Sequence, residues 1–239
     1  MYKTHKGLPA YSAEDFVVAL RSYGDNYWHK HPFHLRWHSG DLDQHALQIW
    51  AANRWYYQKA LPLKDAAILA NCPDVAVRRR WRERIVYQDG VSDGDGGLAD
   101  WLLLSRALGL TEADVLNETL VAPGVRFATD AYVTFARTRP WVEAVAASLT
   151  ELFSPELMRR RVDAAQEHYN WLDPDALRYF SSRVVEAQRD SQFALELVVS
   201  QCTTRAEQDA ALNALAFKCD VLWSMLDAID AACASTAAQ

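Results

Sequence analysis

The chain has 239 residues, half of them hydrophobic, with 25 basic and 31 acidic side chains and a net charge of -6. This length supports one well-packed domain, and no linker rich in proline, glycine and serine divides it, so we expect a single domain over residues 1–239. The acidic balance argues against a nucleic-acid partner held by general electrostatics. Neither the N-terminal segment nor any apolar run suits export or membrane insertion, so we expect a cytoplasmic protein without a membrane partner.

The first predicted helices are marked by their caps. Ser12, with Asp15 three residues later, predicts a helix that ends near Gly24. Residues 27–40 gather aromatic side chains and histidines around a proline and stop at a glycine, which indicates a short helix followed by a turn. Asp41 or Asp43 is expected to cap the next helix.

Residues 50–90 concentrate aromatic, amide and guanidinium groups at helical spacing. Arg54, Tyr57 and Gln58 stand at i, i+3 and i+4 and therefore project from one side of a helix, and Arg84 and Gln88 repeat the spacing. We interpret these faces as a binding surface as well as core.

Prolines should divide this stretch. Pro62 is expected to interrupt the first helix and Pro73 to separate the second segment from the third, so that Lys64 would lie on an antiparallel helical excursion. Several cations would then converge. The neighbouring arginines cannot all point inward from adjacent helical positions, and we expect a solvated face for Arg78, Arg79, Arg80 and Arg82.

The second half of the chain continues the helical pattern. After a glycine-rich loop, residues 98–108, 124–137 and 141–153 are apolar at helical period, and Thr111 with Asp114 caps a further helix. The pairs Ser154–Pro155 and Asp173–Pro174 are typical of helix starts.

Thr204 and Glu207 form a capping box that opens a long C-terminal helix. This helix carries an apolar seam of Leu212, Leu215, Cys219, Leu222, Leu226 and Ile229. No segment alternates with a convincing strand period. We therefore predict an all-α fold, a multi-helix bundle.

Several other chemistries find little support. Cys72, Cys202, Cys219 and Cys233 form no Cys-x-x-Cys pair and suit buried, reduced thiols. His31, His34 and His38 have spacings compatible with a metal, but no Glu-x-x-His is present to complete a di-iron bundle, and we expect no metal. No nucleophile elbow, dinucleotide fingerprint or phosphate-binding loop occurs.

Three residues in the C-terminal half have an ordinary interpretation when taken alone. Lys218 lies among apolar neighbours, and its stem could pack there while the amine reaches water. Tyr179 and Arg183 stand at i and i+4, a pairing that arises on most helices. The spacing lets a phenol and a guanidinium group face one pocket, but it does not require that pocket to exist.

A family resemblance strengthens the functional interpretation. The segments NRWYYQ, LPLKDAAILANCPD, PGVRFATDAYVTFAR, HYNW, YFSSR and FKCDVLWSMLDA, together with HPFH and SLTELFSP, resemble the pyrroloquinoline quinone synthase family from about Phe16 to Ala228. The resemblance implies a haem-oxygenase-like bundle and a homodimer. It also implies an oxidase that needs no cofactor, uses O2 as co-substrate, and closes and oxidises a carboxylated aromatic precursor in pyrroloquinoline quinone biosynthesis.

The resemblance also implies roles for particular residues. Tyr179, Arg183 and Lys218 match family residues around bound oxygen, and Gln88 occupies a further catalytic position. Residues that match the walls of the family's substrate cavity are Tyr27, Trp28, Arg54, Tyr57, Gln58, Lys64, Arg84, Tyr132, Glu151, Met158 and Arg161. Guanidinium groups suit this task, because each can make two charge-assisted hydrogen bonds to a carboxylate.

The chain departs from the family pattern in a concerted way. Trp28, Gln88 and Met158 stand where the family has histidine, and Tyr87 stands where it has an acidic residue. Histidine transfers protons near neutral pH, whereas glutamine can only form hydrogen bonds. Three interpretations therefore stay open: an oxidase of the quinone precursor, a diverged oxidase of another aromatic metabolite, and a non-catalytic protein that binds the quinone or its precursor.

Overall fold

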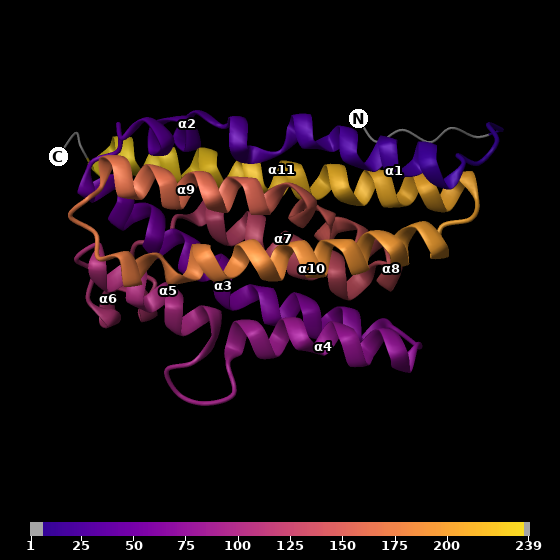
Figure 1. The fold of residues 1–239 in the computed structure, drawn as a ribbon, viewed down its shortest axis with the longest axis horizontal. Coiled ribbons are helices and arrows are strands. Elements are labelled where there is room, and N and C mark those ends of the chain that lie inside the picture. The colour runs from indigo at the N-terminus through magenta and orange to yellow at the C-terminus, as the bar shows by residue number, and fades with distance from the viewer. Residues whose placement is uncertain (1–6, 237–239) are drawn as a thin grey trace.

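The structure is a computed structural model that describes residues 7–236, and within that range it contains helices and no strand (Figure 1). The α-helices are α1 (Ala13–Ser22), α2 (Pro32–Ser39), α3 (Gln44–Asn71), α4 (Val75–Asp89), α5 (Gly96–Ala107), α6 (Glu112–Leu116), α7 (Pro123–Thr138), α8 (Trp141–Ala147), α9 (Ser154–His168), α10 (Arg178–Gln201) and α11 (Arg205–Thr236). Four short 3₁₀ helices join them: η1 (Tyr23–Asn26), η2 (Trp28–Lys30), η3 (Ser148–Phe153) and η4 (Pro174–Leu177). The all-α prediction is confirmed.

Local cap chemistry sets most helix starts as predicted. The side chain of Ser12 accepts the Asp15 N–H at the start of α1, and Asp43 rather than Asp41 caps α3. The predicted box at α11 is formed in both directions, since Glu207 N–H donates to Thr204 Oγ1 and Thr204 N–H donates to Glu207 Oε2. These bonds satisfy N–H groups that have no partner within the helix.

Helix α3 overturns one prediction. It continues through Pro62 to Asn71, so Pro62 does not interrupt it and Lys64 lies on the same helix as Arg54. A proline inside a helix leaves the carbonyl four residues earlier without its usual donor. Here that carbonyl belongs to Gln58, and Nε2 of Gln88 donates to it over 3.1 Å. A contact between two helices thus offsets part of the cost that local sequence reasoning assigned to the proline.

The long helix α3 lies inside the bundle and packs against α4, α5, α7 and α11. Figure 1 shows α4 along one side of the bundle and α11 along the opposite side, with α9 and α10 running lengthwise between them. Beside α3, the buried rings of Trp37, Trp50 and Trp101 follow one another at centroid separations of 4.8 and 5.2 Å. The predicted apolar seam of α11 is buried at all six positions.

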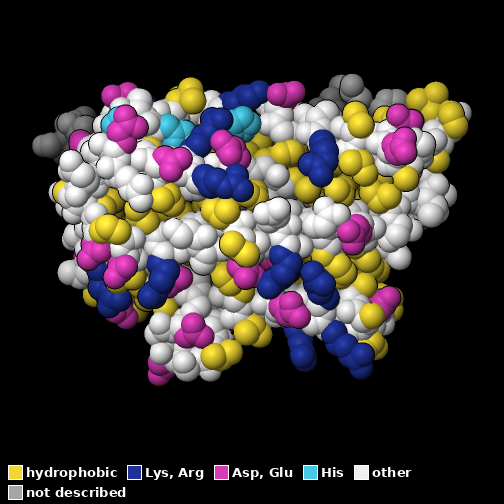
Figure 2. All heavy atoms as spheres, in the orientation of Figure 1, with side chains coloured by type: hydrophobic (Ala, Val, Ile, Leu, Met, Phe, Trp, Pro, Cys, Tyr) yellow, Lys and Arg dark blue, Asp and Glu magenta, His cyan; other side chains and the backbone are white. Residues whose placement is uncertain are grey.

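The outer surface carries mixed charge. Figure 2 shows acidic and basic side chains interspersed on the face it displays, with basic groups gathered over α4. Arg79, Arg80 and Arg82 of α4 are exposed, as predicted, and Arg78 is half-buried against the Cys72 carbonyl. Cys72, Cys202 and Cys219 are buried free thiols, and Cys233 is half-buried. Among residues 7–236 no helix is long and apolar enough to cross a bilayer.

Candidate functional site

The candidate site is a buried cavity of about 60 Å³ bounded by α3, α7, η3, α9, α10 and α11 and by the segment around η2. Most of the residues predicted for the site line it directly: Tyr27, Trp28, Arg54, Tyr57, Lys64, Tyr132, Glu151, Met158, Tyr179, Arg183 and Lys218. The remaining four are buried behind that wall: Gln58, Arg84 and Arg161 contact residues of it, and Gln88 contacts Gln58. The structure therefore gathers the whole predicted set in one place.

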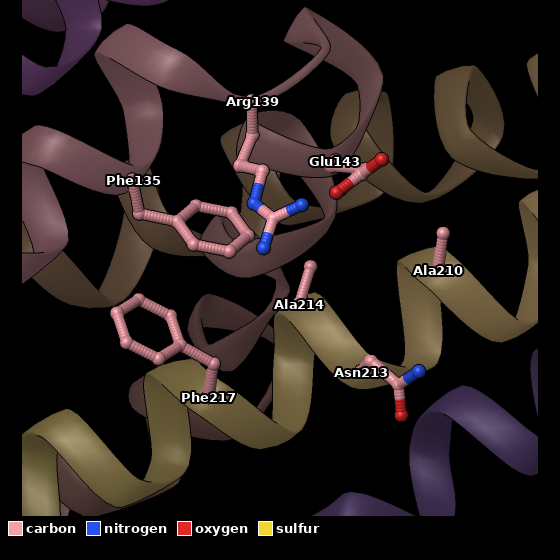
Figure 3. A pocket seen from close by; sticks show the side chains of 7 residues that line it. All are labelled: Phe135, Arg139, Glu143, Ala210, Asn213, Ala214 and Phe217. Atoms are coloured by element: carbon pink, nitrogen blue, oxygen red, sulfur yellow. The ribbon is translucent and has the colours of Figure 1, made fainter. Parts of the chain in front are cut away.

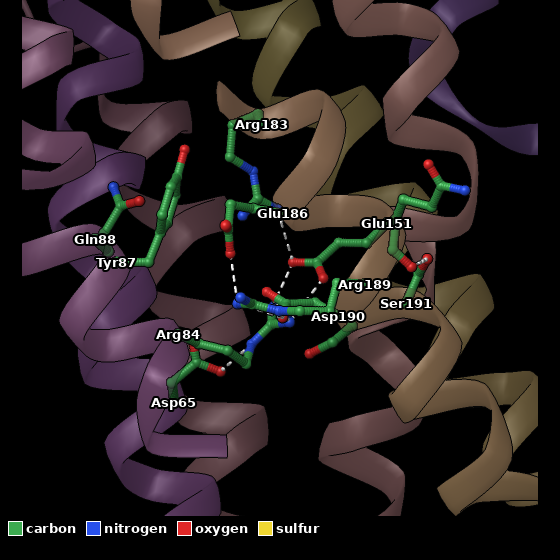
Figure 4. Close-up of polar contacts among 12 residues, drawn as sticks. Asp65, Arg84, Tyr87, Gln88, Glu151, Arg183, Glu186, Arg189, Asp190 and Ser191 are labelled. Atoms are coloured by element: carbon green, nitrogen blue, oxygen red, sulfur yellow. Dashed lines mark hydrogen bonds and ion pairs between the residues drawn. The ribbon is translucent and has the colours of Figure 1, made fainter. Parts of the chain in front are cut away.

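One part of the site is a network of opposite charges. Arg84 on α4 forms two hydrogen bonds to Glu151 on η3, one of them 2.8 Å long, and an ion pair of 3.0 Å to Asp190 on α10. Its Nε also lies 3.3 Å from Asp65. Figure 4 shows Arg84 and Arg183 converging on Glu151. We call this network the paired cluster; its members are Lys64, Asp65, Arg84, Glu151, Arg183 and Asp190.

The remaining contacts complete the cluster. Lys64 lies 2.5 Å from Asp65, which also accepts a hydrogen bond of 2.8 Å from the Trp81 indole. Arg183 lies 3.3 Å from Glu151. Burial by itself would raise the pKa of Glu151, but the charges of Arg84 and Arg183 outweigh it and lower that pKa to about 2. Glu151 is thus held ionised and is a poor proton acceptor.

A second group of cations has no carboxylate partner. Within residues 7–236, neither Arg54 nor Arg161 nor Lys218 forms an ion pair with an acidic side chain, although they are only 4%, 0% and 1% exposed. We call these three residues the unpaired cations. Ions this deeply buried normally require a charged partner.

Soft and aromatic groups surround the unpaired cations. The Arg54 guanidinium group lies 4.7 Å from the Trp28 ring and 4.4 Å from the Tyr57 ring, and its Nη1 contacts the Met225 sulfur. Nζ of Lys218 donates to the Tyr57 hydroxyl over 2.6 Å and lies 3.6 Å from the Tyr132 ring centre. Such contacts stabilise a cation without neutralising it.

The environment lowers the pKa of all three unpaired cations. Burial lowers the pKa of Arg54, and burial together with the charge of Arg54 lowers that of Arg161 to about 9. For Lys218, burial and then the charges of Lys64 and Arg54 bring the pKa well below its usual value. Of the two lysines at the cavity, Lys218 therefore holds its proton less firmly than Lys64.

His34 orients Arg161 from behind the cavity. Nδ1 of His34 lies 2.9 Å from the Trp28 carbonyl, which can only accept, so that nitrogen carries the proton. Nε2 is then an acceptor, and Nη2 of Arg161 donates to it over 2.6 Å. Burial and the charge of Arg161 lower the pKa of His34 well below its usual range. His34 is accordingly a neutral hydrogen-bond acceptor, and the other histidines of α2 form no metal-binding group with it in the described chain.

Two of the residues that the family resemblance predicts to stand in place of histidine, Trp28 and Met158, also contact the unpaired arginines. The Trp28 ring faces both Arg54 and Arg161, and Nη1 of Arg161 lies 3.9 Å from the Met158 sulfur. Gln88 lies behind Gln58 and is not part of the cavity wall. None of these three side chains can accept a proton at neutral pH.

Sequence reasoning missed several members of the site. The cavity wall also includes Leu61, Ser148, Thr150, Ser154 and Leu222. Leu61 and Leu222 stand four residues after Tyr57 and Lys218, so helical spacing alone was a usable signal for them. Asp65 and Asp190 of the paired cluster were missed too, because the partner that they share, Arg84, lies on another helix.

A second depression lies outside the bundle core, between α7, α8 and α11 (Figure 3). It measures about 370 Å³ and is walled by the stacked rings of Phe135 and Phe217, with Arg139 and Glu143 at one side. Figure 3 shows the rings of Phe135 and Phe217 facing each other between their two helices, with Arg139 beside them. Arg139 is exposed, so this depression lacks the desolvated cations that distinguish the cavity.

Donors without partners show what the cavity can bind. Nε of Arg54, Nε of Arg161 and Nε2 of Gln58 are buried and have no hydrogen-bond partner among the described residues. Buried donors of this kind cost free energy unless something accepts from them. Together with the unpaired cations, they form a receptor for an anionic ligand rich in oxygen acceptors.

Comparison with known proteins agrees with this geometry. The model of the TENA/THI-4/PQQC family matches residues 18–228. A pyrroloquinoline-quinone synthase of Klebsiella pneumoniae is 47% identical over 218 residues, 91% of this chain and 87% of that protein. One from Pseudomonas putida is 48% identical over 225 residues, 94% of this chain and 89% of that protein.

The fold has a solved counterpart. A domain of unknown function from Shewanella denitrificans with a haem oxygenase-like fold superposes with a TM-score of 0.77 at 13% identity, covering 92% of this chain and 93% of that one. The predicted haem-oxygenase-like arrangement is thus confirmed. From the family match and these relatives, this chain belongs to the TENA/THI-4/PQQC family.

Proposed function

We propose that this protein is an oxidase of the pyrroloquinoline-quinone synthase type, which closes and oxidises a carboxylated quinone precursor with O2 as co-substrate and without a cofactor. The observation that carries the proposal is the set of unpaired cations, Arg54, Arg161 and Lys218, buried at one cavity. Relatives that are about half identical bear the corresponding name.

Arg54 and Arg161 are the groups that receive the substrate's carboxylates. Each retains a free Nε–H donor, and a guanidinium group can make two parallel hydrogen bonds to one carboxylate. Within the protein, these two guanidinium groups contact ring faces, sulfur atoms and one neutral imidazole. An incoming anion can therefore bind to them without displacing a charged group.

The cavity must widen to admit such a ligand. Pockets for ligands of this size typically measure about 300 to 1,000 Å³, several times the volume of the cavity. The members of the paired cluster are tied to one another across four elements, whereas Trp28 and Met158 are held by aromatic and sulfur contacts. We infer that the cavity widens by movement of the Trp28 and Met158 side chains.

Proton transfer falls to Lys218 in this proposal. Oxidation of a carbon acid requires a group that removes protons, and among the described residues no histidine lines the cavity. Because the pKa of Lys218 starts well below its usual value, part of its amine stays neutral when an anion is bound, and this form can take a proton from the substrate. The ammonium ion so formed, with Arg183, then stabilises reduced oxygen by charge and hydrogen bonding.

Mixing protein and precursor without oxygen, and then admitting air, tests the proposal. We expect quinone absorbance to appear only after air is admitted, with consumption of O2, and we expect Lys218→Met to lose at least about 10²-fold in rate. Precursor that binds but consumes no O2 would favour the non-catalytic binder, the candidate supported by the loss of histidine at Trp28, Gln88 and Met158. Oxygen consumption only with another aromatic acid would favour the diverged oxidase.

We also propose that the protein is a cytoplasmic homodimer. The family resemblance supports this, as does Phe127 on α7, whose side chain is 78% exposed. Sedimentation at micromolar concentration should give a mass near twice 27.0 kDa. A single species of monomer mass would contradict it.

A further inference from the structure

Gln88 occupies a position that the proposed chemistry does not explain. It is 3% exposed, lies off the cavity wall and cannot transfer a proton. Its Nε2 lies 3.1 Å from the backbone oxygen of Gln58 and 3.3 Å from the side-chain oxygen of the same residue. Both amide protons of Gln88 are therefore directed at one residue, across the contact between α4 and α3.

The backbone oxygen of Gln58 is available because of Pro62. In an uninterrupted α-helix the N–H four residues later would occupy it, and proline has none. A carbonyl can only accept, so the atom of Gln88 facing it must be the nitrogen. The backbone of α3 thereby fixes which way the Gln88 amide points.

The orientation of the Gln88 amide determines the orientation of the Gln58 side chain and, through it, that of the Tyr179 hydroxyl. Because the Gln88 NH2 group faces it, the nearby atom of the Gln58 side chain must be the oxygen. That oxygen lies 2.8 Å from the Tyr179 hydroxyl, which must then be the donor. The phenol proton points away from the cavity that Tyr179 lines, and an oxygen lone pair is left toward it.

Close packing surrounds both ends of this chain of contacts. A Cβ atom at Gly97 would come within 2.8 Å of Gln88 Oε1, so glycine at this position leaves room for the Gln88 amide. The Tyr179 ring meets Trp101 edge to face at 4.9 Å.

We propose that Gln88 is a positioning residue: anchored on the Gln58 carbonyl that Pro62 leaves free, it locks the Gln58 side chain so that the Tyr179 hydroxyl presents an acceptor, not a proton, to the ligand. This inference rests on the proposed function for its consequence in turnover, but not for its geometry. It predicts that Tyr179 accepts a hydrogen bond from a protonated group of the ligand or from Lys218.

Neutron diffraction from crystals of the unmodified protein tests the geometry without any substrate. The deuterium of the Tyr179 hydroxyl should lie toward Gln58 Oε1, and both deuterium atoms of Gln88 Nε2 should lie toward Gln58. A Tyr179 deuterium directed into the cavity, or the oxygen of Gln88 facing Gln58, would overturn the inference.

Two substitutions test whether Gln88 is anchored on the Gln58 carbonyl that Pro62 leaves free. Gln88→Met keeps the length of the side chain but removes its donors, and should lower the melting temperature by about 2 to 8 °C through the unsatisfied carbonyl. Pro62→Ala restores an N–H that can donate to that carbonyl. In this background Gln88→Met should cost less than half as much, while Arg82→Met, exposed on the same helix, should have the same small effect in both backgrounds. Equal losses for Gln88→Met in the two backgrounds would refute the anchoring step.

Turnover decides the positioning role. In the double variant Pro62→Ala/Gln88→Met, stability should return, but kcat for the precursor should stay at least about 10-fold below that of Pro62→Ala, with KM changed less than about twofold. Recovery of kcat together with stability would show a merely structural role and refute the positioning. If the unmodified protein does not turn the precursor over, the proposed function fails, and the neutron map alone confirms or refutes the orientation of Tyr179.

Discussion

Arg84 and Arg161 are both buried guanidinium groups of one site, but they are stabilised by opposite means. Arg84 has three carboxylates around it, and burial, which would lower its pKa, is outweighed by Glu151 and Asp65, so that its pKa rises well above the usual value. Arg161 contacts an imidazole, a thioether and ring faces, and its pKa falls to about 9. The first group is satisfied within the protein, whereas the second is incomplete without a ligand.

This contrast divides the predicted substrate-binding residues by task. Lys64, Arg84 and Arg183 belong to the paired cluster, which ties α3, α4, η3 and α10 together around the cavity. Arg54, Arg161 and Lys218 supply positive charge that nothing in the described chain neutralises. The paired cluster should therefore dominate folding stability, and the unpaired cations should dominate ligand affinity.

Removing Arg84 should have the largest effect. Arg84→Met removes the buried cation paired with Asp190 and one of the two cations paired with Asp65, and should lower the free energy of unfolding by about 3 to 5 kcal/mol. Denaturant unfolding measures it. Arg82→Met, exposed on the same helix, should stay within about 0.5 kcal/mol of the unmodified protein. Comparable losses for the two variants would mean that the paired cluster adds little stability.

Arg54→Met should show the reverse pattern. It removes a buried charge that has no carboxylate partner, so the free energy of unfolding should stay level or rise. The affinity for pyrroloquinoline quinone should fall by about 1.5 to 3 kcal/mol, the scale of a charged hydrogen bond. Lys59→Met, on the outer side of the same helix, serves as the control for binding. If Arg54→Met is strongly destabilised but binds the quinone normally, the distinction between the paired cluster and the unpaired cations is wrong.

Acid should weaken the unpaired side of the site through His34. Its pKa in the folded protein lies well below 6.5, so below that pH the unfolded chain binds a proton that the native protein does not. Stability from this residue is complete above about pH 6.5 and should fall by about 2 kcal/mol at pH 5. The dependence of unfolding on pH should flatten by about one proton in His34→Gln and remain unchanged in His45→Gln. An unchanged slope in His34→Gln would exclude this role.

Much of the fold followed from local sequence, because its determinants are local. Ser12, Thr111 and Thr204 cap helices with partners three residues away, and the seam of α11 follows from helical period alone. Pro62 did not follow this rule, since the Gln58 carbonyl that it leaves without a donor accepts from Gln88, thirty positions after Gln58 in the chain. A local rule gives the cost of a proline but not a remote partner that offsets it.

The sequence indicated which side chains gather at the cavity, but not which of the cations form ion pairs. Most of the side chains that family resemblance and helical faces predicted for the site line one cavity. Which cations would be neutralised depended on contacts such as Arg84 with Glu151, 67 positions apart, and no spacing in the sequence encodes those. The orientation of Tyr179 likewise depended on a backbone carbonyl of another helix.

Calorimetric titration with pyrroloquinoline quinone at pH 8, in buffers of different ionisation enthalpy, tests the central claim most directly. An anion placed among the unpaired cations should raise the depressed pKa of Lys218, so binding should be accompanied by uptake of up to about one proton per site. The uptake should disappear in Lys218→Met while weaker binding persists. Absence of binding at millimolar quinone, or tight binding with no proton uptake, would contradict the account.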